Sequence, residues 1–243
     1  WSLNGRPVDK LQGNGPGWRG FIADISTATR AEAKVTFMAH YDLLTQLPNR
    51  TLLNATLERA FTRVSADEII GMLYVDLDHF KAINDSHGHA VGDCVLAKVA
   101  QCIEDVVRPR DMVARIGGDE FVVLMPNLDS VDAGLLVAER IVEIIGTSIE
   151  IDGLVMPIGC SIGVAFAPHD AAAGDALLRA ADLAMYDVKS RGRRGISIFD
   201  PEMQTQMIER RTLELDLRGA ILRKELELHY QPLLRIETGE VVG

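Results

Sequence analysis

The chain has 243 residues, of which 47% are hydrophobic and 25% are charged, and its formal net charge is −10. This composition excludes a chain that is disordered throughout, and the length suits one α/β domain with extra segments at either end. The acidic balance argues against a nucleic-acid-binding surface, because contacts to a phosphate backbone need a basic stripe.

The three cysteines, Cys94, Cys102 and Cys160, are scattered without metal-ligand spacing, so they indicate reduced thiols in a cytoplasmic protein. No segment approaches the roughly 20 apolar residues of a membrane span, and the first residues lack a signal-peptide pattern. We therefore expect no membrane contact from this segment, although a parent protein could be membrane-attached elsewhere. A chain that begins at Trp1 is expected to be part of a longer protein.

The first third of the chain alternates turns, helices and one buried strand. Residues 1–28 are rich in Gly, Asn and Pro, and predict turns that lead into a single strand at 20–26. Residues 27–38 favour a helix that connects two domains. After a Pro-containing turn, four-residue spacing of apolar side chains predicts a helix over 51–64, and the apolar run 69–75 predicts a buried strand.

The middle of the chain predicts a second helix over 89–107 and then a hairpin. Two short apolar runs, 112–116 and 121–125, flank Gly117 and Gly118, and Gly-Gly between such runs favours a tight turn. The remaining predicted elements are a helix at 130–145, one long strand at 154–166, a helix at 175–189 and a closing strand at 195–199. The order of elements predicts one mixed α/β unit of about 160 residues.

The chain changes character after Pro201. A long charged helix is predicted over 202–224, followed by a strand-like segment over 226–236. We expect this tail to open a further domain whose body is absent.

Two carboxylates, Asp76 and Asp78, follow the buried strand. Burying them is costly unless a positive group lies between them, and Mg²⁺ typically takes one or two carboxylates together with substrate phosphates. Asp76 comes directly after the strand and is the better-held metal ligand. The direction of Asp78 depends on where the strand ends, and a solvated strand end is the alternative for the pair.

A second acidic pair, Asp119 and Glu120, follows the two glycines of the hairpin. Glycines permit left-handed backbone conformations and leave room for a ligand to lie against the turn. The alternative is an ordinary exposed hairpin tip. The acids run straight into apolar residues, which favours a position at the sheet rather than in open solvent.

Basic and amide side chains complete the set of candidates. Lys81 can neutralise phosphate charge, and Asn84 and Asp93 can pair with the donors and acceptors of a guanine edge. The basic turn 189–194 can bind phosphate or simply complement a helix dipole. Together with the four acids, these residues suit metal-assisted phosphoryl chemistry.

Five motifs follow one another along residues 39–200. In chain order they are Asp42-x-Leu44-Thr45-x-Leu47-Pro48-Asn49-Arg50, Asp76-x-Asp78-x-Phe80-Lys81-x-x-Asn84-Asp85, Gly88-His89-x-x-Gly92-Asp93, Gly117-Gly118-Asp119-Glu120-Phe121 and Met185-Tyr186-x-x-Lys189-x-x-Gly192-Arg193. With these motifs, residues 39–200 resemble the GGDEF family of diguanylate cyclases, whose signature is identical to the run 117–121.

The resemblance implies a fold and an activity. The fold is a ferredoxin-like, nucleotidyl-cyclase-type α/β (α+β) domain, with a central mostly antiparallel sheet flanked by helices. The activity is the condensation of two GTP molecules into cyclic di-GMP with release of two pyrophosphates, dependent on Mg²⁺ or Mn²⁺. Each domain supplies half of a site, so the resemblance implies a homodimer.

The resemblance also assigns roles to individual residues. Asp76, the backbone carbonyl of Leu77 and Asp119 would hold Mg²⁺, with Glu120 beside the metals. Asp119 is also a candidate proton acceptor for the attacking 3′-hydroxyl. The remaining roles are Lys81 on the phosphates in the transition state, Lys189 and Arg193 on the phosphates, and Asn84 and Asp93 on guanine. Whether Asp78 or Glu120 binds a metal directly is left open.

Arg108 and Asp111 form an Arg-x-x-Asp motif shortly before the signature, which in the family is an inhibitory site for cyclic di-GMP. The resemblance therefore implies product inhibition. Two departures from the family pattern are Gln46, where glycine is usual, and Arg194, where asparagine often stands. Neither removes an expected ligand.

The two ends resemble parts of other domains. Residues 1–28 resemble the tail of a PAS sensor domain, 29–40 a helical linker, and 201–243 a linker helix with the start of an EAL phosphodiesterase domain. An alternative to an active cyclase is a catalytically weak module that binds GTP or cyclic di-GMP and regulates an adjoining EAL domain.

Overall fold

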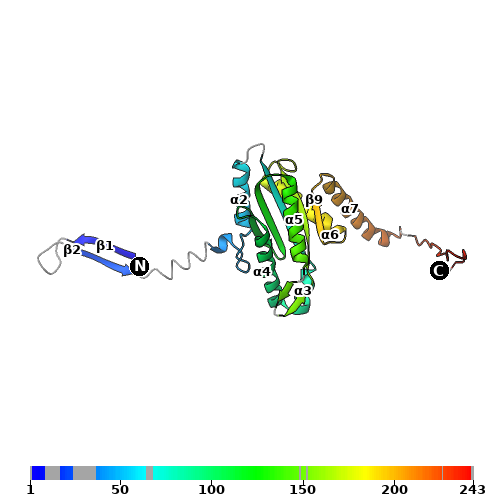
Figure 1. Cartoon of the computed structure of the whole chain (residues 1–243), viewed down its shortest axis with the longest axis horizontal. Helices are drawn as coiled ribbons and strands as arrows, with labels where there is room; N and C mark the ends of the chain where they lie inside the picture. The colour runs from blue at the N-terminus through cyan, green and yellow to red at the C-terminus, as the bar shows by residue number, and fades with distance from the viewer. Residues whose placement is uncertain are drawn as a thin grey trace. The chain divides into compact units, whose positions relative to one another are not determined.

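The computed structural model describes residues 2–8, 17–23, 37–63, 68–147, 149–151, 153–225 and 227–241. In chain order the elements are β1 (Ser2–Val8), β2 (Gly17–Ala23), α2 (Arg50–Arg63), β3 (Ile69–Asp78), α3 (Phe80–His87), α4 (His89–Val106), β4 (Met112–Gly117), β5 (Glu120–Leu128), α5 (Val131–Gly146), β6 (Ile149–Ile151), β7 (Leu154–Met156), β8 (Gly159–Ala167), α6 (Gly174–Ser190), β9 (Gly195–Ile198) and α7 (Glu202–Arg223) (Figure 1). Among the residues described, no helix combines the length and apolar character that a membrane crossing requires. Residues 1–199 and 200–243 form two separate units.

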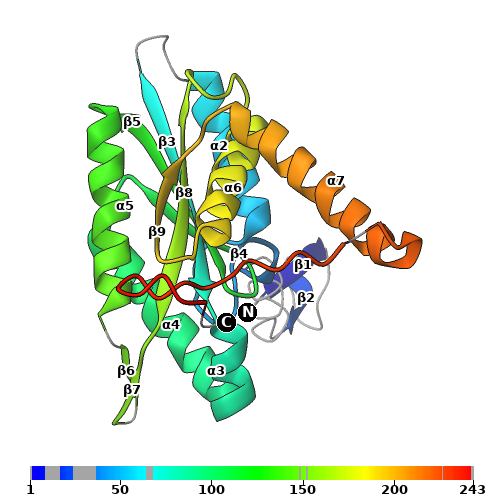
Figure 2. The ribbon, with the colours of Figure 1, turned by 90° about the vertical axis from the view of Figure 1, so that its right-hand side faces the viewer.

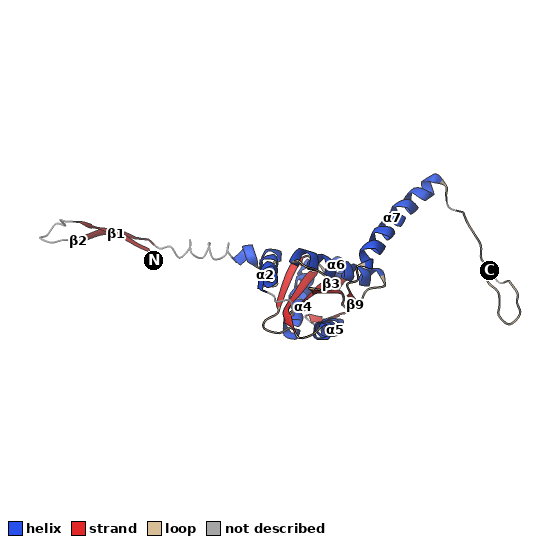
Figure 3. Cartoon of the chain, turned by 90° about the horizontal axis from the view of Figure 1, so that it is seen from above, coloured by secondary structure: helices blue, strands red, loops and turns tan. Residues whose placement is uncertain are grey.

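A five-stranded sheet in the order β4-β5-β3-β8-β9 forms the centre of the first unit. All neighbours pair antiparallel except β8 and β9, which run parallel. Seen from above, the strands lie between α2 and α6 on one side and α4 and α5 on the other (Figure 3). The expected α/β fold, with a mostly antiparallel sheet flanked by helices, is confirmed.

Strand β3 lies in the middle of the sheet, and its alternating side chains feed two separate cores. Leu73, Val75 and Leu77 pack with α4 and α5. Met72 and Tyr74 pack with α2 and α6. Because side chains two residues apart share a face, Asp76 and Asp78 project on the same side as Tyr74. The strand extends three residues beyond its predicted end, and this extension settles the direction of Asp78.

Helix α6 approaches β8 closely at Gly163. A Cβ atom there would collide with the backbone oxygen of Ala181 and the backbone nitrogen of Met185, so only glycine fits. The packing fixes the course of α6, whose last turn carries Lys189.

Several predicted elements are wrong. The single strand expected over residues 154–166 is two strands in different sheets, separated by Pro157, whose missing N–H cannot join a ladder. The segment 227–241, most of which was expected to be strand, is irregular apart from an isolated bridge between Leu234 and Val241. α3 and β6 were not predicted as elements.

The N-terminal segment forms a hairpin of β1 and β2, not a single strand, because residues 2–8 pair with residues 17–23. The predicted strand residues 24–26 and the predicted connector residues 27–36 lie outside the described residues. Residues 37–40 are helical.

The loop of residues 41–49, here called the N-terminal loop, is closed by short hydrogen bonds. The Asp42 carboxylate accepts from both the backbone N–H and the hydroxyl of Thr45, at 2.8 Å each. The Asp42 carbonyl accepts from the N–H of Gln46 at 2.9 Å. Closing this loop places Gln46 at φ +60, in the left-handed region that favours glycine.

We predict that Gln46→Gly raises the free energy of unfolding by about 0.5–1 kcal/mol, because it relieves a left-handed backbone at a residue with a Cβ atom. The measurement is chemical denaturation of both proteins. Gln46→Ala is the matched control and should give no gain, because alanine keeps the Cβ atom. Equal stability of the glycine and alanine variants would contradict the explanation.

Candidate functional site

The Gly-Gly hairpin lies beside the end of β3. Residues Gly118 and Asp119 form its two-residue turn, between Gly117 and Glu120. Glu120 is the register partner of Asp76, and the N–H of Leu77 donates to the carbonyl of Asp119 at 3.3 Å. The structure therefore brings together Asp76, Leu77, Asp119 and Glu120, the four positions expected to hold metal.

Arg115 holds the hairpin turn in place. Its Nε and Nη2 atoms donate to the carbonyl of Gly118 at 3.1 and 2.8 Å. Its Nη1 atom donates to Asp42 Oδ1 at 2.9 Å. Although burial alone would raise the pKa of Asp42, the hydrogen bonds from Thr45 and Arg115 lower it. The N-terminal loop is thus tied to the residue that precedes Asp119.

Sequence reasoning missed Arg115, because its two partners are not both local. Asp42 lies 73 positions away, so no spacing rule pairs the two. The only available signal was a single arginine in an otherwise apolar strand, next to the glycines. A cavity of about 300 Å³ opens at this point, and both arginine and aspartate line it together with the start of α2.

Asp76 is a buried carboxylate with one cationic partner. Its exposed fraction is 6%, and Lys189 Nζ lies 2.7 Å from its Oδ2 atom. Burial raises the pKa of Asp76 to about 6, against the opposing effect of Lys189, and the nearby charges of Asp119 and Glu120 raise it further. The site therefore has more negative charge than the protein neutralises.

Tyr74, which the sequence did not single out, lies two residues before Asp76 on the same face of β3. Burial, then the charges of Asp182 and Glu120, raise the pKa of Tyr74. The tyrosine therefore stays neutral beside the acids.

The donor set fits a hard divalent cation. The described residues contain no cluster of three or more His, Cys, Asp or Glu side chains arranged to hold a metal unaided. Mg²⁺ does not require such a cage, because it commonly uses one or two carboxylates and completes its octahedron with water and substrate phosphate oxygens. Asp76 and the neighbouring Asp119 carry carboxylate oxygens of the kind that such a site uses.

Asp78 differs from Asp76 in having both carboxylate oxygens engaged. Oδ1 accepts from the Ser161 hydroxyl at 2.8 Å, and Oδ2 accepts from the N–H of Arg194 at 3.0 Å. Ser161 is itself fully buried on β8, opposite Asp76. Sequence reasoning missed Ser161, although a hydroxyl within the apolar strand 159–167 was a usable signal.

The proposed guanine readers lie on two adjoining helices. The side chain of Asn84 on α3 lies against Gly92 on α4, where a Cβ atom would collide with it. Asp93 is the next residue and is exposed. The structure thus brings Asn84 and Asp93 to one place. Lys81 is exposed near the start of α3, which follows the end of β3.

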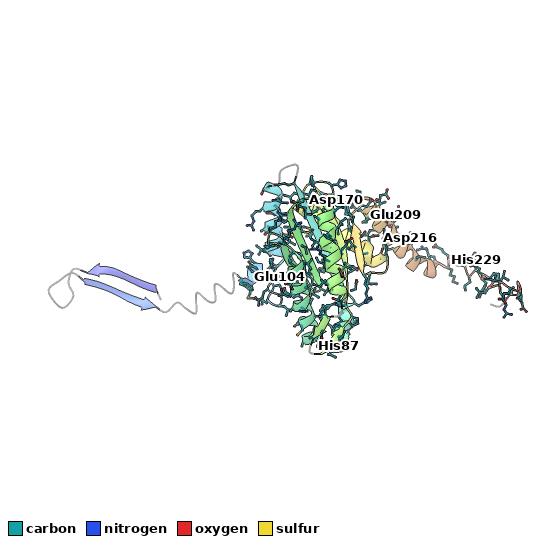
Figure 4. The ribbon with its side chains drawn as sticks, in the orientation of Figure 1. His87, Glu104, Asp170, Glu209, Asp216 and His229 are labelled. Carbon is teal, nitrogen blue, oxygen red and sulfur yellow. The ribbon has the colours of Figure 1, made fainter. Side chains whose placement is uncertain are left out.

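These helices mark one end of the domain. In Figure 4, His87 at the end of α3 and Asp170 just after β8 lie at opposite ends. β8 runs antiparallel to β3, so Asp170 lies near the start of β3 and α3 near its end. Figure 2 shows α3 and the small β6–β7 hairpin together at that end.

Arg108 and Asp111 form one compact turn. The N–H of Arg108 donates to Asp111 Oδ2, and the N–H of Asp111 donates to the carbonyl of Arg108, both at 2.9 Å. Burial raises the pKa of Asp111, although Arg108 opposes it. Among the described residues, Asp111 Oδ1 is buried without a hydrogen-bond partner. The Arg108 guanidinium instead faces Asp129, with 3.5 Å between Nη1 and Oδ2.

Comparison with known proteins identifies relatives that are much longer than this chain. It is 40% identical over 219 residues to the bifunctional diguanylate cyclase/cyclic di-GMP phosphodiesterase MucR of Pseudomonas aeruginosa, covering 90% of this chain and 32% of MucR. It is 38% identical over 224 residues to a signalling protein of Caulobacter vibrioides, covering 91% and 28%. It is 35% identical over 209 residues to the cyclic di-GMP phosphodiesterase PdeR of Escherichia coli, covering 86% and 31%. The chain spans about a third of the length of these relatives.

Solved structures match the first unit. The GGDEF domain of TpbB (YfiN) from Pseudomonas aeruginosa is similar with a TM-score of 0.67 and 38% identity, covering 69% of this chain and 99% of that one. The coiled coil and GGDEF domain of DgcB from Caulobacter crescentus, solved with c-di-GMP, gives a TM-score of 0.63 and 29% identity, covering 72% and 93%. The family model described as diguanylate cyclase, GGDEF domain, matches residues 39–195. The chain therefore belongs to the GGDEF domain family of diguanylate cyclases.

Proposed function

We propose that this domain is an active, Mg²⁺-dependent diguanylate cyclase that condenses two GTP molecules into cyclic di-GMP and two pyrophosphates. The observation that carries the proposal is the meeting of Asp76 with the Asp119–Glu120 pair, beside a lysine at 2.7 Å. An excess of buried negative charge next to a Gly-Gly turn suits a cation that arrives with a nucleotide triphosphate. Bound Mg²⁺ would neutralise phosphate charge and stabilise the pyrophosphate as it leaves.

The side chains around that centre divide the remaining work. Asp76, the carbonyl of Leu77 and Asp119 hold the cation, and Asp119 also accepts the proton of the attacking 3′-hydroxyl. Glu120 lies opposite Asp76 on the neighbouring strand. Lys189, which neutralises Asp76 in the structure, is placed to move onto a phosphate once a divalent cation takes over that role. The other assigned contacts are Lys81 and Arg193 to phosphate, and Asn84 and Asp93 to guanine.

One domain holds only half of the reaction. Each 3′-oxygen attacks the α-phosphorus of the GTP held by a second copy, and pyrophosphate leaves, so synthesis requires two domains face to face. The dimer need last only as long as the two transfers. The relative named as a phosphodiesterase gives the competing function, a module that binds nucleotide and regulates a neighbouring domain.

We further propose that the segments outside residues 41–200 belong to adjoining domains of a longer protein, or to the linkers that lead to them. The chain spans about a third of its relatives, one of which is named bifunctional. On this proposal β1 and β2 end a PAS-like sensor domain, and α7 leads into an EAL domain. Limited proteolysis of a longer natural chain, with cleavage concentrated near residues 30 and 205, would support these boundaries, and cleavage only within 41–199 would contradict them.

Asp119→Ala should lower cyclic di-GMP synthesis from GTP and Mg²⁺ by about 10²-fold or more, because it removes a metal ligand and a proton acceptor together. Folding should survive, since Leu77 bonds to the backbone carbonyl of Asp119 and not to its side chain. The measurement is product formation by chromatography, with Asp132→Ala on α5 as the control for lost charge. Tight GTP binding by a folded wild-type protein that makes no product would favour the regulatory module.

Asp76→Asn should stabilise the free protein above pH 6 but not at pH 4. A raised pKa of about 6 means that the folded state holds a proton that the unfolded state releases near pH 4. The free energy of unfolding therefore falls as the pH rises from 4 through 6. Above pH 6 the buried charge of Asp76 lowers it by the full amount, about 2–3 kcal/mol.

The test is denaturant unfolding at pH 4 and pH 8 without divalent cation. Asp85→Asn, at an exposed position on α3, controls for the change in net charge. Mg²⁺ with a non-hydrolysable GTP analogue should then stabilise wild type more than Asp76→Asn. A variant that is no more stable at pH 8 than at pH 4, relative to wild type, contradicts the assignment of buried charge.

Arg108→Ala should abolish product inhibition without lowering the initial rate. The Arg108 side chain is partly exposed, and its Nη1 atom lies 3.5 Å from the exposed Asp129 Oδ2, so the guanidinium is open to a guanine base. Progress curves of wild type should flatten as cyclic di-GMP accumulates, whereas those of the variant stay linear. Arg110→Ala, at an exposed neighbour in the same turn, is the control and should flatten like wild type. Flattening of both variants would remove the inhibitory role from Arg108.

A further inference from the structure

Asp78 is almost fully buried, with 4% of its surface exposed, and it is not part of the metal and phosphate centre described above. Its two carboxylate oxygens point at two fixed donors, the hydroxyl of Ser161 and the backbone N–H of Arg194. Asp76 instead meets a lysine side chain, which has many conformations open to it. The two acids of the motif therefore have different surroundings on the same face of one strand.

The segment that Asp78 holds is the turn of residues 191–194, which joins α6 to β9. Three consecutive residues in this turn have positive φ: Gly192 at +120, Arg193 at +67 and Arg194 at +54. Left-handed conformations are unfavourable for residues with a Cβ atom, so this turn needs outside contacts to persist. The N–H of Arg193 donates to the carbonyl of Val188 at 3.0 Å, and Arg191 is held by its N–H on the carbonyls of Asp187 and Val188 and by an ion pair with Asp187. These contacts all go back to α6, whereas the Asp78–Arg194 bond comes from β3.

The packing around the turn supports the same anchor. The Arg194 side chain lies over Gly159, where a Cβ atom would collide with it, and Gly159 is the register partner of Asp78. The next residue, Gly195, pairs with Ser161. Strand β8 thus presents both the hydroxyl that orients Asp78 and the flat surface on which Arg194 rests.

We propose that Asp78 is a positioning residue that fixes the turn of residues 191–194 and so holds Arg193 where a nucleotide triphosphate can meet it. The proposal rests on the phosphate-binding role given to Arg193 under the proposed function. Asp76 and Asp78 both bind the chain where α6 leads into β9. Asp76 forms an ion pair with Lys189, and Asp78 accepts a hydrogen bond from the N–H of Arg194, five residues later. The ion pair of Lys189 with Asp76 would give way if a divalent cation bound Asp76, whereas the Asp78–Arg194 hydrogen bond would remain.

The test compares Asp78→Ala with Asp78→Asn. Asparagine can keep both hydrogen bonds, by accepting from Arg194 with its oxygen and donating to the Ser161 hydroxyl with its amide. Alanine leaves both donors unsatisfied. Asp78→Ala should raise the KM for GTP and the Kd for a non-hydrolysable analogue about 10-fold, with kcat and the Mg²⁺ concentration for half-maximal rate nearly unchanged. For Asp78→Asn, both KM and Kd should stay within about 3-fold of wild type.

A double-mutant cycle with Arg193→Ala separates positioning from a general loss of structure. If Asp78 acts through Arg193, the double variant should bind the analogue no more weakly than Arg193→Ala alone. Multiplied losses would overturn the proposal. The proposal would also be overturned if Asp78→Asn bound the analogue as weakly as Asp78→Ala, or if either variant needed a much higher Mg²⁺ concentration. These outcomes would indicate that Asp78 is a metal ligand.

A readout free of nucleotide keeps this test separate from the proposed function. The Arg194 amide should exchange its hydrogen slowly in wild type and in Asp78→Asn, and at least 10-fold faster in Asp78→Ala. If wild type binds no GTP analogue, the proposed function fails, yet the exchange data still report on the anchor. Should Asp78→Ala not fold, Ser161→Ala replaces it: the loss of one orienting bond should speed Arg194 exchange, and unchanged exchange would overturn the proposal.

Discussion

The burial of two carboxylates on one face of β3 is the constraint on which the rest of the site depends. A charged group taken out of water must find compensating charge or hydrogen bonds, or its pKa shifts. Asp78 finds two hydrogen-bond donors, and it fixes a strained turn in doing so. Asp76 finds one lysine, has two further acids nearby, and keeps a raised pKa. Asp78, whose carboxylate is fully hydrogen-bonded, and Asp76, whose negative charge is only partly compensated, thus lie two residues apart.

The surrounding structure is arranged to keep the unsatisfied charge in place. Antiparallel pairing sets Glu120 opposite Asp76, and Arg115 fixes the turn that carries Asp119 by clamping the carbonyl of Gly118. The same guanidinium reaches Asp42, so the hairpin is hydrogen-bonded to the N-terminal loop. These contacts hold Asp76, Asp119 and Glu120 close together despite their mutual repulsion. The proposed cation site is thereby preorganised before a cation binds.

The parts of this arrangement that the sequence predicted are those set by local pattern. The buried run 69–75 and the Gly-Gly between two apolar runs predicted β3 and the β4–β5 hairpin, and the resemblance then supplied the roles of Asp76 and Asp119. Gln46 and Arg194, which depart from the family pattern at positions where glycine or asparagine is usual, both have positive φ. Glycine and asparagine are the residues that tolerate this conformation, so the pattern reports backbone geometry and not chemistry.

Contacts between residues far apart in the chain could not be predicted from the sequence. The partner of Asp78 lies 116 positions along the chain, and that of Arg115 lies 73 positions away, so only the folded sheet shows them. Pro157 lies between β7 and β8, which the sequence predicted as one strand. The described part of the predicted strand at 226–236 has no regular strand structure. Whether such a segment forms a strand depends on the strand it can pair with and not on its own composition alone.

The direct test of this account is a measurement of the Asp76 pKa by NMR of its carboxyl carbon, in the free protein and with Mg²⁺ and a non-hydrolysable GTP analogue. The account predicts a pKa near 6 in the free protein, raised mainly by burial. It predicts a fall of at least about one unit when cation and nucleotide bind together, because an adjacent positive charge favours the ionised form. An ordinary pKa near 4 in the free protein, or a raised pKa that cation and nucleotide leave unchanged, would contradict it.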